Sequence, residues 1–343
     1  MKLSTGTFAK AIQYTVICSA VTWAMTSHVM ASDQKYKFNL ALESGDRESA
    51  SGKSMQMWAD LIEKNSKGRM KVNIFYQGEL GGQQEIFDQL VKGNIQMMLT
   101  WPQTSYDERL AVNYIPYLTL GWDDALKAYG KDGWLKNLMG PIYADIGLKY
   151  FGPYPEGFGG VATKGRYATN YDSAKGMKVR SQPIFPLPQT MKAMGFEPIP
   201  IDWNEVYTAI QTGVVDGDSS NVIYWDYQYF RDQLNYFVHT KHNFSSYALL
   251  MNNDMWKSLD AEDQGIIDDA AQVVIDKQFQ DAKAEDDKWI AAAQQAGMKY
   301  IEPSNAELKD WVKRVRAEVW PLAEEKIGKD IMDKIRANAS SPE

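Results

Sequence analysis

The sequence contains very few residues suited to thiol or metal chemistry. Cys18 is the only cysteine, and there are three histidines among 343 residues. Cys18 and His28 lie in a leader segment described below, so the mature chain is expected to have no thiol and no disulfide. This excludes thiol catalysis and leaves little for a histidine-based metal site or general base. We therefore expect neither a cofactor nor a metal.

Common catalytic and nucleotide-binding motifs are also missing. There is no G-x-S-x-G elbow, no H-E-x-x-H zinc helix, no P-loop and no G-x-G-x-x-G fingerprint. The chain is thus not expected to be an enzyme. A periplasmic hydrolase or lyase that uses Asp216, Asp218 and His242 stays open as the alternative.

The chain is short of positive charge. It has 37 basic and 44 acidic residues, a net charge of −7, and removing residues 1–31 leaves 35 basic residues and a net charge of −9. An acidic surface argues against nucleic acid or anionic membranes as partners. Since the overall field does not favour anions, any anion site must be built locally.

Only the start of the chain resembles a targeting signal. Lys2 and Lys10 accompany an apolar stretch at residues 11–23, and Ala31 ends a Val-Met-Ala sequence typical of signal-peptide cleavage. Polar interruptions in the stretch disfavour the alternative of a retained anchor. A lipoprotein role for Cys18 is disfavoured because the residues before it are not small. We expect a secreted, periplasmic and soluble mature protein of the Gram-negative type, since no later segment is apolar enough to span a bilayer.

The first half of the mature chain alternates strand and helix patterns. Residues 36–42, 70–76 and 95–100 are typical of strands, and helices are expected at residues 49–65 and after Gly82. This β-α-β-α-β order predicts parallel strands and an α/β fold. In such folds ligands gather at the carboxyl ends of the strands. Glu43 and Trp101 follow the first and third strands, which makes both candidates for ligand contact.

A second lobe is expected to begin at residues 154–157, where turn residues cluster, and the chain is expected to return to the first lobe at a strand over residues 246–251. We predict a first lobe of residues 32–154 plus about 243–277, and a second of residues 155–242 plus about 278–343. Such crossings predict a hinged cleft.

Residues 261–296 contain no proline and one glycine, Gly265, with apolar residues at helical spacing. Such a helix would be roughly 54 Å long and should bridge both lobes. The alternative is two helices with a break near residues 278–286. The tail, residues 306–337, predicts further helices interrupted at Pro321.

The run from Gly176 to Gly217 carries the clearest functional pattern. It places Arg180 on a short strand, followed by a Pro-rich connection to Trp203, a helix that ends at Gly213, and a tight turn at Asp216-Gly217. A buried guanidinium needs an anion, and its planar fork suits a carboxylate. An aromatic ring nearby would provide a wall for the rest of a small organic anion.

Several motifs resemble the periplasmic solute-binding proteins of tripartite ATP-independent periplasmic (TRAP) transporters, the DctP family. They are Glu79-Leu80-Gly81, Ile115-Pro116-Tyr117-Leu118, Gly176-x-Lys178-x-Arg180 and Trp203-x-Glu205-Val206-Tyr207-x-Ala209-x-Gln211-x-Gly213-x-x-Asp216-Gly217. The resemblance implies two α/β lobes around a hinged cleft, a lobe-bridging helix, and delivery of an organic acid to a membrane permease.

The resemblance also implies roles for individual residues. Arg180 would clamp the ligand carboxylate, and the alternative for this residue is a structural ion pair. Trp203 would pack against the body of the ligand, and the alternative is a position in the core. Ser220 stands where many members have an asparagine that helps to hold the carboxylate, and Asn221 is the alternative for that role. Tyr224 matches a cleft aromatic of the ectoine-binding branch. Gly159-Gly160 replaces the second arginine of sialic-acid members, which disfavours that ligand.

The remaining candidates have structural alternatives. Glu43 would bind a ligand ammonium or hydroxyl, or simply start a helix. Phe158, Asp218 and His242 are further candidate contacts that could equally be packing or interlobe residues. The expected ligand is a carboxylate, a sulfonate or an ectoine-like zwitterion, and the protein is expected to be a monomer. A sensor receptor that hands its liganded form to another partner stays open. Replacing Arg180 with alanine is expected to abolish binding while leaving the unliganded melting temperature nearly unchanged.

Overall fold

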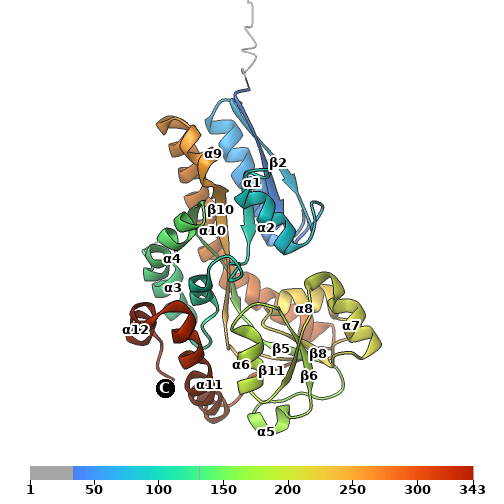
Figure 1. Cartoon of the computed structure of the whole chain (residues 1–343). Helices are drawn as coiled ribbons and strands as arrows, with labels where there is room; N and C mark the ends of the chain where they lie inside the picture. The colour runs from blue at the N-terminus through green and yellow to red at the C-terminus, as the bar shows by residue number, and fades with distance from the viewer. Residues whose placement is uncertain (1–33, 131, 343) are drawn as a thin grey trace, which may run out of the picture. The chain divides into compact units, whose positions relative to one another are not determined.

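A computed structural model describes residues 34–130 and 132–342, and these residues form two β-sheets surrounded by helices (Figure 1). The predicted signal peptide and Cys18 lie outside the described residues. The two sheets confirm the α/β class. Within the described residues, no helix is both long enough and apolar enough to cross a membrane.

The first sheet has five strands in the order β2-β1-β3-β10-β4. Its strands are β1 (Tyr36–Leu42), β2 (Met70–Phe75), β3 (Met97–Thr100), β4 (Leu148–Phe158) and β10 (Phe244–Asn252). β1 pairs in parallel with β2 and β3, which confirms the predicted β-α-β-α-β unit, and β10 pairs antiparallel to β3 and β4.

Residues of β1 alternate between the two faces of this sheet, as the period of a strand requires. Phe38, Leu40 and Leu42 pack in one core cluster with Trp58 of α1 (Ala50–Asn65). Ala41 packs on the other face with residues of α2 (Gln83–Val91). Helices on both faces therefore hold the carboxyl ends of β1 and β3 in place.

Residues 154–157, predicted as turns, lie inside strand β4. The register shifts between Ser245 and Ser246 of β10, opposite Glu156. β4 is an edge strand of the sheet, where prolines are tolerated because one side of the strand has no hydrogen-bonding partner to lose. Pro153 and Pro155 therefore did not end the strand, and the turn prediction is wrong.

The second sheet has six strands in the order β11-β9-β5-β8-β6-β7. They are β5 (Val161–Thr163), β6 (Lys178–Ser181), β7 (Glu197–Pro200), β8 (Gly217–Ser219), β9 (Tyr236–Val238) and β11 (Lys299–Ile301). The helical segments between these strands are α5 (Tyr171–Ala174), α6 (Leu187–Ala193), η2 (Trp203–Glu205), α7 (Val206–Thr212) and α8 (Ile223–Phe230). The strand that carries Arg180 and the helix that ends at Gly213, whose φ is 76°, are as predicted.

Gly217 begins strand β8 instead of forming the predicted tight turn. It pairs with Thr163 of β5. A Cβ atom built at this position would lie 2.0 Å from the carbonyl oxygen of Ala162. A glycine is needed here because β8 and β5 approach each other closely. The sequence alone does not distinguish a glycine required by such a contact from a glycine required by a turn.

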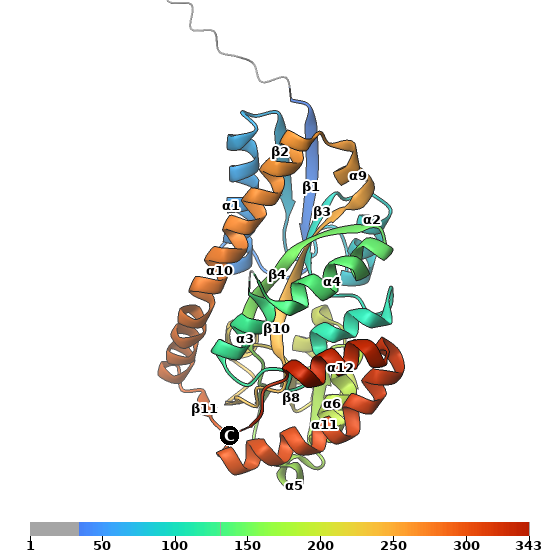
Figure 2. The ribbon, with the colours of Figure 1, turned by 90° about the vertical axis from the view of Figure 1, so that its left-hand side faces the viewer.

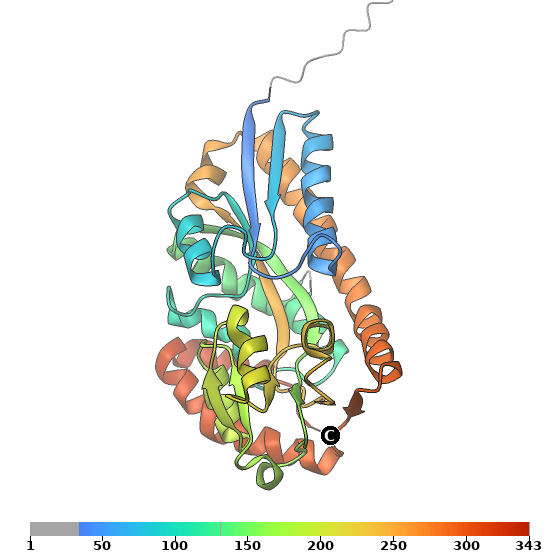
Figure 3. The ribbon, with the colours of Figure 1, turned by 90° about the vertical axis from the view of Figure 1, so that its right-hand side faces the viewer.

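Helix α10 (Ala261–Gln295) is one continuous helix, so the two-helix alternative is wrong. Its N-cap Asp260 accepts a hydrogen bond from the amide of Asp263. α10 lies beside α1 in Figures 2 and 3, and it also contacts β4, α8 and β11. It therefore packs against elements of both sheets, as predicted for a bridging helix.

The C-terminal helices are α11 (Asn305–Ile327) and α12 (Lys329–Asn338). Helix α11 continues through Pro321, so the predicted interruption there is wrong, and the break comes at Gly328. Proline removes one amide donor, but buried residues on both sides of it hold the helix to the protein: Trp320 Nε1 donates to Pro116 O at 3.0 Å, and Ala323 is fully buried.

Helix α11 also contributes to two cores. Trp311 and Val312 pack with Met177 near the second sheet, whereas Trp320 and Ala323 pack in the cluster that contains Ala41 of the first. The remaining helices are η1 (Glu108–Tyr114), α3 (Trp122–Tyr129), α4 (Trp134–Asp145) and α9 (Asn253–Ser258). The boundaries of the two lobes stay a prediction.

Candidate functional site

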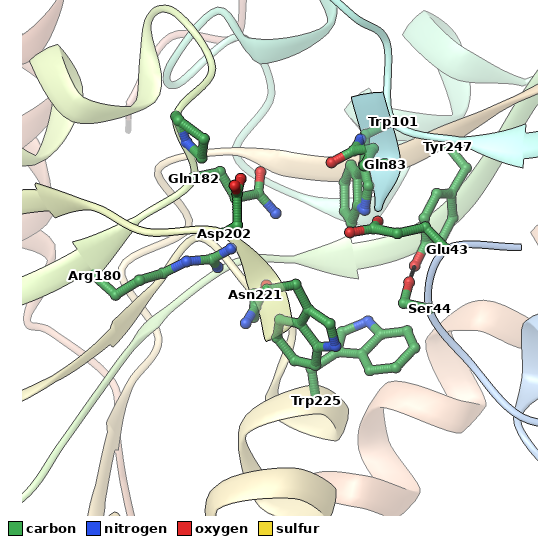
Figure 4. A pocket seen from close by; sticks show the side chains of 12 residues that line it. Glu43, Ser44, Gln83, Trp101, Arg180, Gln182, Asp202, Asn221, Trp225 and Tyr247 are labelled. Atoms are coloured by element: carbon green, nitrogen blue, oxygen red, sulfur yellow. Dashed lines mark hydrogen bonds between the residues drawn. The ribbon is translucent and has the colours of Figure 1, made fainter. Parts of the chain in front are cut away.

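A pocket with about 380 Å³ of empty space lies between the two sheets, and residues from both line it (Figure 4). From the first sheet and its loops come Glu43, Ser44, Gln83, Trp101 and Tyr247. From the second come Arg180, Gln182, Pro183, Asp202, Trp203, Asn221 and Trp225. Five of the residues predicted from the sequence, namely Glu43, Trp101, Arg180, Trp203 and Asn221, therefore meet at one pocket.

The first-sheet side is built from strand ends. Glu43 follows β1, Trp101 follows β3, and Gln83 begins α2. Tyr247 comes from β10, and its ring centroid lies 4.4 Å from that of Trp101. The carboxyl ends of parallel strands thus form this wall, as expected for an α/β fold.

Arg180 is the cation of the second-sheet side. Its side chain is almost completely buried, with 2% exposure. Nε donates to Ile201 O at 2.8 Å, and Nη1 donates to Asp218 Oδ1 at 3.3 Å. Among the described residues, Nη2 has no hydrogen-bond acceptor. In Figure 4 the guanidinium points toward the residues of the opposite wall. It is thus anchored from behind and retains donor capacity toward the pocket.

Asp218 organises the base of this anchor. Its Oδ2 accepts from Asn221 Nδ2 at 2.7 Å, and its Oδ1 accepts from the amide of Ser219 at 2.7 Å. Asp226 lies beneath, with neither carboxyl oxygen hydrogen-bonded to a described residue. Burial and the nearby Asp218 raise the pKa of Asp226 well above its usual range. Burial raises the pKa of Asp218 as well, but the Arg180 guanidinium opposes that shift, so Asp218 is the acid of the two that pairs with the cation.

Aromatic rings close two sides of the pocket. The rings of Trp203 and Trp225 lie 5.7 Å apart at 79°, and the Arg180 guanidinium carbon lies 5.8 Å from the Trp203 ring centroid. Trp225 Nε1 donates to Glu156 Oε1 at 2.8 Å. The indoles are therefore fixed by packing and hydrogen bonding, and present apolar faces beside the cation.

Two acids face the same space as Arg180. Asp202 and Glu43 both line the pocket. Removal from water raises the pKa of Glu43 to about 7, an effect that Arg180 opposes and Asp202 strengthens. The pocket thus offers one anion-binding group and two groups that attract a cation or an N–H donor.

The raised pKa of Glu43 predicts a pH-dependent effect of Glu43→Gln. An acid whose folded-state pKa of about 7 exceeds its ordinary value of 4.5 stabilises the fold fully below pH 4.5 and loses this contribution as the pH rises through 7. Gln cannot ionise, so its free energy of unfolding does not fall with pH in this way. The stability of Glu43→Gln relative to the unliganded wild type should therefore increase by about 1–3 kcal/mol as the pH rises from 4.5 to 8. Urea denaturation across this range measures the difference. A pH-independent difference would contradict the prediction.

The other predicted residues lie away from this pocket. Asp218 touches Arg180 but does not line the space. Phe158 packs in the core against Phe244, with ring centroids 5.1 Å apart. Tyr224 lines a different pocket, whereas its neighbour Trp225 lines both pockets.

Ser220 and His242 form a buried pair with each other. Ser220 Oγ lies 3.0 Å from His242 Nε2, and Thr240 Oγ1 lies 2.6 Å from His242 Nδ1. Burial lowers the pKa of His242 to about 3, so the ring is neutral. The placement supports Asn221, not Ser220, as the polar neighbour of Arg180 at the pocket.

Several lining residues were not predicted. Gln182 and Pro183 follow the Arg180 strand and Asp202 precedes Trp203, so the rule of strand ends could have found them. Ser44 follows Glu43 in the same way. Tyr247 lies in strand β10, which is buried along its whole length. Apolar and polar residues therefore do not alternate in its sequence, and nothing indicates which face is turned to the pocket. Within the described residues, no group of three or more His, Cys, Asp or Glu side chains could hold a metal ion.

Comparison with known proteins identifies the family of the chain. The model of bacterial extracellular solute-binding protein family 7, DctP, matches residues 43–326. The ectoine-binding periplasmic protein TeaA of Halomonas elongata is 26% identical over 293 residues, covering 82% of this chain and 84% of TeaA. The ectoine/5-hydroxyectoine-binding periplasmic protein UehA of Ruegeria pomeroyi is 28% identical over 276 residues, covering 78% of each.

Solved structures of similar fold include that of TeaA, with a TM-score of 0.82 and 23% identity over 88% of this chain and 99% of that one. A TRAP periplasmic solute-binding protein of Haemophilus influenzae with bound L-gulonate has a TM-score of 0.82 and 22% identity, covering 89% of this chain and 100% of that one. The chain described here belongs to the DctP family of bacterial extracellular solute-binding proteins, the binding components of TRAP transporters.

Proposed function

We propose that this protein captures a small organic acid that also carries a cationic or N–H-donating group, an ectoine-like zwitterion, in the pocket of Arg180 and Glu43. One observation carries the proposal: Arg180 and Glu43 line opposite walls of a single aromatic pocket (Figure 4). A ligand with one charge of each sign satisfies both walls at once.

Arg180 is suited to hold the acid group of the ligand. It is buried, and Asp218 is its only acidic hydrogen-bond partner among the described residues. A carboxylate or a sulfonate can accept from the remaining donors of the guanidinium. Asn221, held by the same Asp218, supports the orientation of the clamp.

The acids on the pocket wall favour a zwitterion over a plain dicarboxylate. A second carboxylate of the ligand would lie close to Glu43 and Asp202, where like charges repel. A cationic or N–H group at that end would instead pair with them. The names of TeaA and UehA, which refer to ectoine, are in keeping with this choice.

Delivery and location complete the proposal. The protein acts in the periplasm as a monomer. It closes over its ligand by a hinge motion between two lobes: one consists of residues 32–154 plus about 243–277, and the other of the rest of the mature chain. The closed form then passes the ligand to the membrane permease subunits of a TRAP transporter. It binds reversibly and catalyses no reaction, since the pocket presents a clamp and not a nucleophile with its base.

A thermal-shift screen tests the ligand class. A ligand that binds only the folded state raises the melting temperature, by the equivalent of about 2.7 kcal/mol at 100 times its dissociation constant. We expect ectoine-like zwitterions to give larger shifts than dicarboxylates such as succinate at equal concentration. Glu43→Gln should reduce the shift for zwitterions and leave that for simple monocarboxylates nearly unchanged.

Two results would contradict this proposal. Larger shifts with dicarboxylates than with zwitterions would refute the zwitterion class while keeping Arg180 as the clamp. Conversion of any bound ligand into a new product, detected by mass spectrometry, would refute reversible binding without catalysis.

A further inference from the structure

A second pocket lies behind Trp225, and Arg180 does not line it. It has about 450 Å³ of empty space, part of which is open to solvent. Its walls come from the start of α1, from β4, from α8 and from α10. Helices α1 and α10 lie side by side in Figures 2 and 3. The walls of the pocket are therefore packed helices and a strand, not surface loops.

The walls of this pocket are largely aromatic. The rings of Tyr224 and Trp289 lie 5.0 Å apart at 60°, and those of Tyr224 and Trp225 lie 4.8 Å apart at 69°. Tyr154 adds a further ring, and its hydroxyl is held by Ser54 at 2.9 Å. The faces of aromatic rings attract cations, and the Lys288 ammonium already lies 4.9 Å from the centroid of the Trp289 ring.

The charged groups of the pocket all have the same sign. Glu156, Glu285 and Asp286 line it, and none of its lining residues is a lysine, arginine or histidine. Glu156 accepts from Trp225 and Ser245, and Glu285 accepts from Trp289 and Lys288. These two carboxyl groups are therefore satisfied within the protein.

Asp286 is different. The residue is 9% exposed, and no described residue forms a hydrogen bond or an ion pair with its carboxyl group, whose oxygens keep some contact with solvent. Burying a carboxylate without a partner is costly, and the usual remedies are a proton or a cation. Burial raises the pKa of Asp286 to about 6; His239 and Lys283 oppose the shift, and Asp287 and Glu302 add to it. Near neutral pH the group therefore carries charge that nothing in the pocket balances.

We propose that this pocket is a second binding site, for a small organic cation such as a quaternary ammonium ion, with Asp286 as counter-ion and Tyr224 and Trp289 as its aromatic walls. The ligand differs in kind from that of the first pocket, since it needs no acid group. The ligand reaches the site through an adjoining open groove, which shares Tyr224, Gln278 and Trp289 with the pocket and is also lined by Lys53, Lys277 and Lys288.

Choline and its neutral isostere 3,3-dimethyl-1-butanol test this proposal in the full mature protein. The two have the same shape and differ in charge, and the tryptophans at the pocket provide a fluorescence signal. We expect saturable choline binding to the wild type and binding of the isostere at least about tenfold weaker, because the cation–π and charge interactions are lost. Asp286→Asn should weaken choline binding about 30-fold or more.

Glu43→Gln is the matched control, because it removes an acid from the first pocket. Choline affinity should be unchanged in this variant. Loss of choline binding in Glu43→Gln but not in Asp286→Asn would place choline in the first pocket and overturn the proposal. Equal affinity for choline and its isostere, or no saturable choline binding to the wild type, would also overturn it.

If the Asp286→Asn variant does not fold, Trp289→Leu provides a second test of the proposed cation site. Trp289 lies at a partly exposed helix position, and leucine keeps the apolar bulk while removing the ring face. We expect choline affinity to fall roughly 3- to 30-fold. An unchanged affinity in a folded Trp289→Leu protein would contradict the aromatic site.

Discussion

Arg180→Ala should raise the dissociation constant of any anionic ligand by about 30-fold or more, because removing one partner of a buried, hydrogen-bonded charge pair typically costs 2–5 kcal/mol. It should also destabilise the unliganded protein by about 3 kcal/mol. Asp218 is fully buried and pairs with Arg180 at 3.3 Å, so the substitution leaves its charge without a counter-ion. Isothermal titration measures the first effect and urea denaturation the second.

A double variant separates binding from stability. Arg180→Met together with Asp218→Asn removes both charges of the pair, and replacing a whole buried pair by neutral groups is often close to neutral in stability. We expect the double variant to recover most of the lost stability and none of the lost affinity. If ligand binding returned along with stability, Arg180 would not be the clamp.

This expectation differs from that of the sequence alone. The sequence favours a ligand clamp over the alternative of a structural ion pair for Arg180, and therefore predicts that Arg180→Ala leaves the unliganded melting temperature nearly unchanged. The structure shows the partner, Asp218, on a neighbouring strand of the same sheet. The clamp is therefore part of the fold as well as of the site.

Gly217→Ala should destabilise the protein by about 3–5 kcal/mol. The added Cβ would lie 2.0 Å from Ala162 O and 2.9 Å from the Cα of Thr163, and both are backbone atoms of the paired strand β5. Neither can move without separating the two strands. Since Asp218 is the next residue, displacement of β8 should also weaken ligand binding, and urea denaturation with titration checks both effects.

Gly265→Ala is the matched control for this substitution. Gly265 lies in helix α10 and is exposed, and a Cβ atom added there would have no obstructing atom of the described residues within 4 Å. The same change of residue should here stabilise the protein, by about 0.5–1 kcal/mol, because alanine favours the helix more than glycine does. A similar loss of stability in both variants would show that strand contact is not the cause.

Sequence patterns predicted the local elements well where one face of an element is buried. β1 and α10 are examples, because their apolar residues recur with the period of a strand or a helix. The rule of strand ends then placed Glu43 and Trp101 at the pocket. The errors at β4 and α11 have a shared cause: prolines that usually end an element are tolerated when tertiary packing makes no use of the missing amide.

The choice between Tyr224 and Trp225 could not be made from the sequence. Helix α8 is aromatic or apolar at most of its positions, so no periodicity shows which face it turns to the pocket. The pairing of Arg180 with Asp218, 38 residues later in the sequence, and the unpaired state of Asp286 likewise depend on how distant segments pack. Each needed the tertiary structure.

The alternation of the chain between the two sheets affects how ligand preference can change over generations. The walls of the first pocket are encoded in separate stretches: Glu43 and Trp101 precede Arg180, Asn221 and Trp225 in the gene, and Tyr247 follows on the first-sheet side. Exchanging one contiguous gene segment between relatives would therefore combine mismatched halves of the pocket. New specificities in such a protein are expected to arise by individual substitutions rather than by recombination.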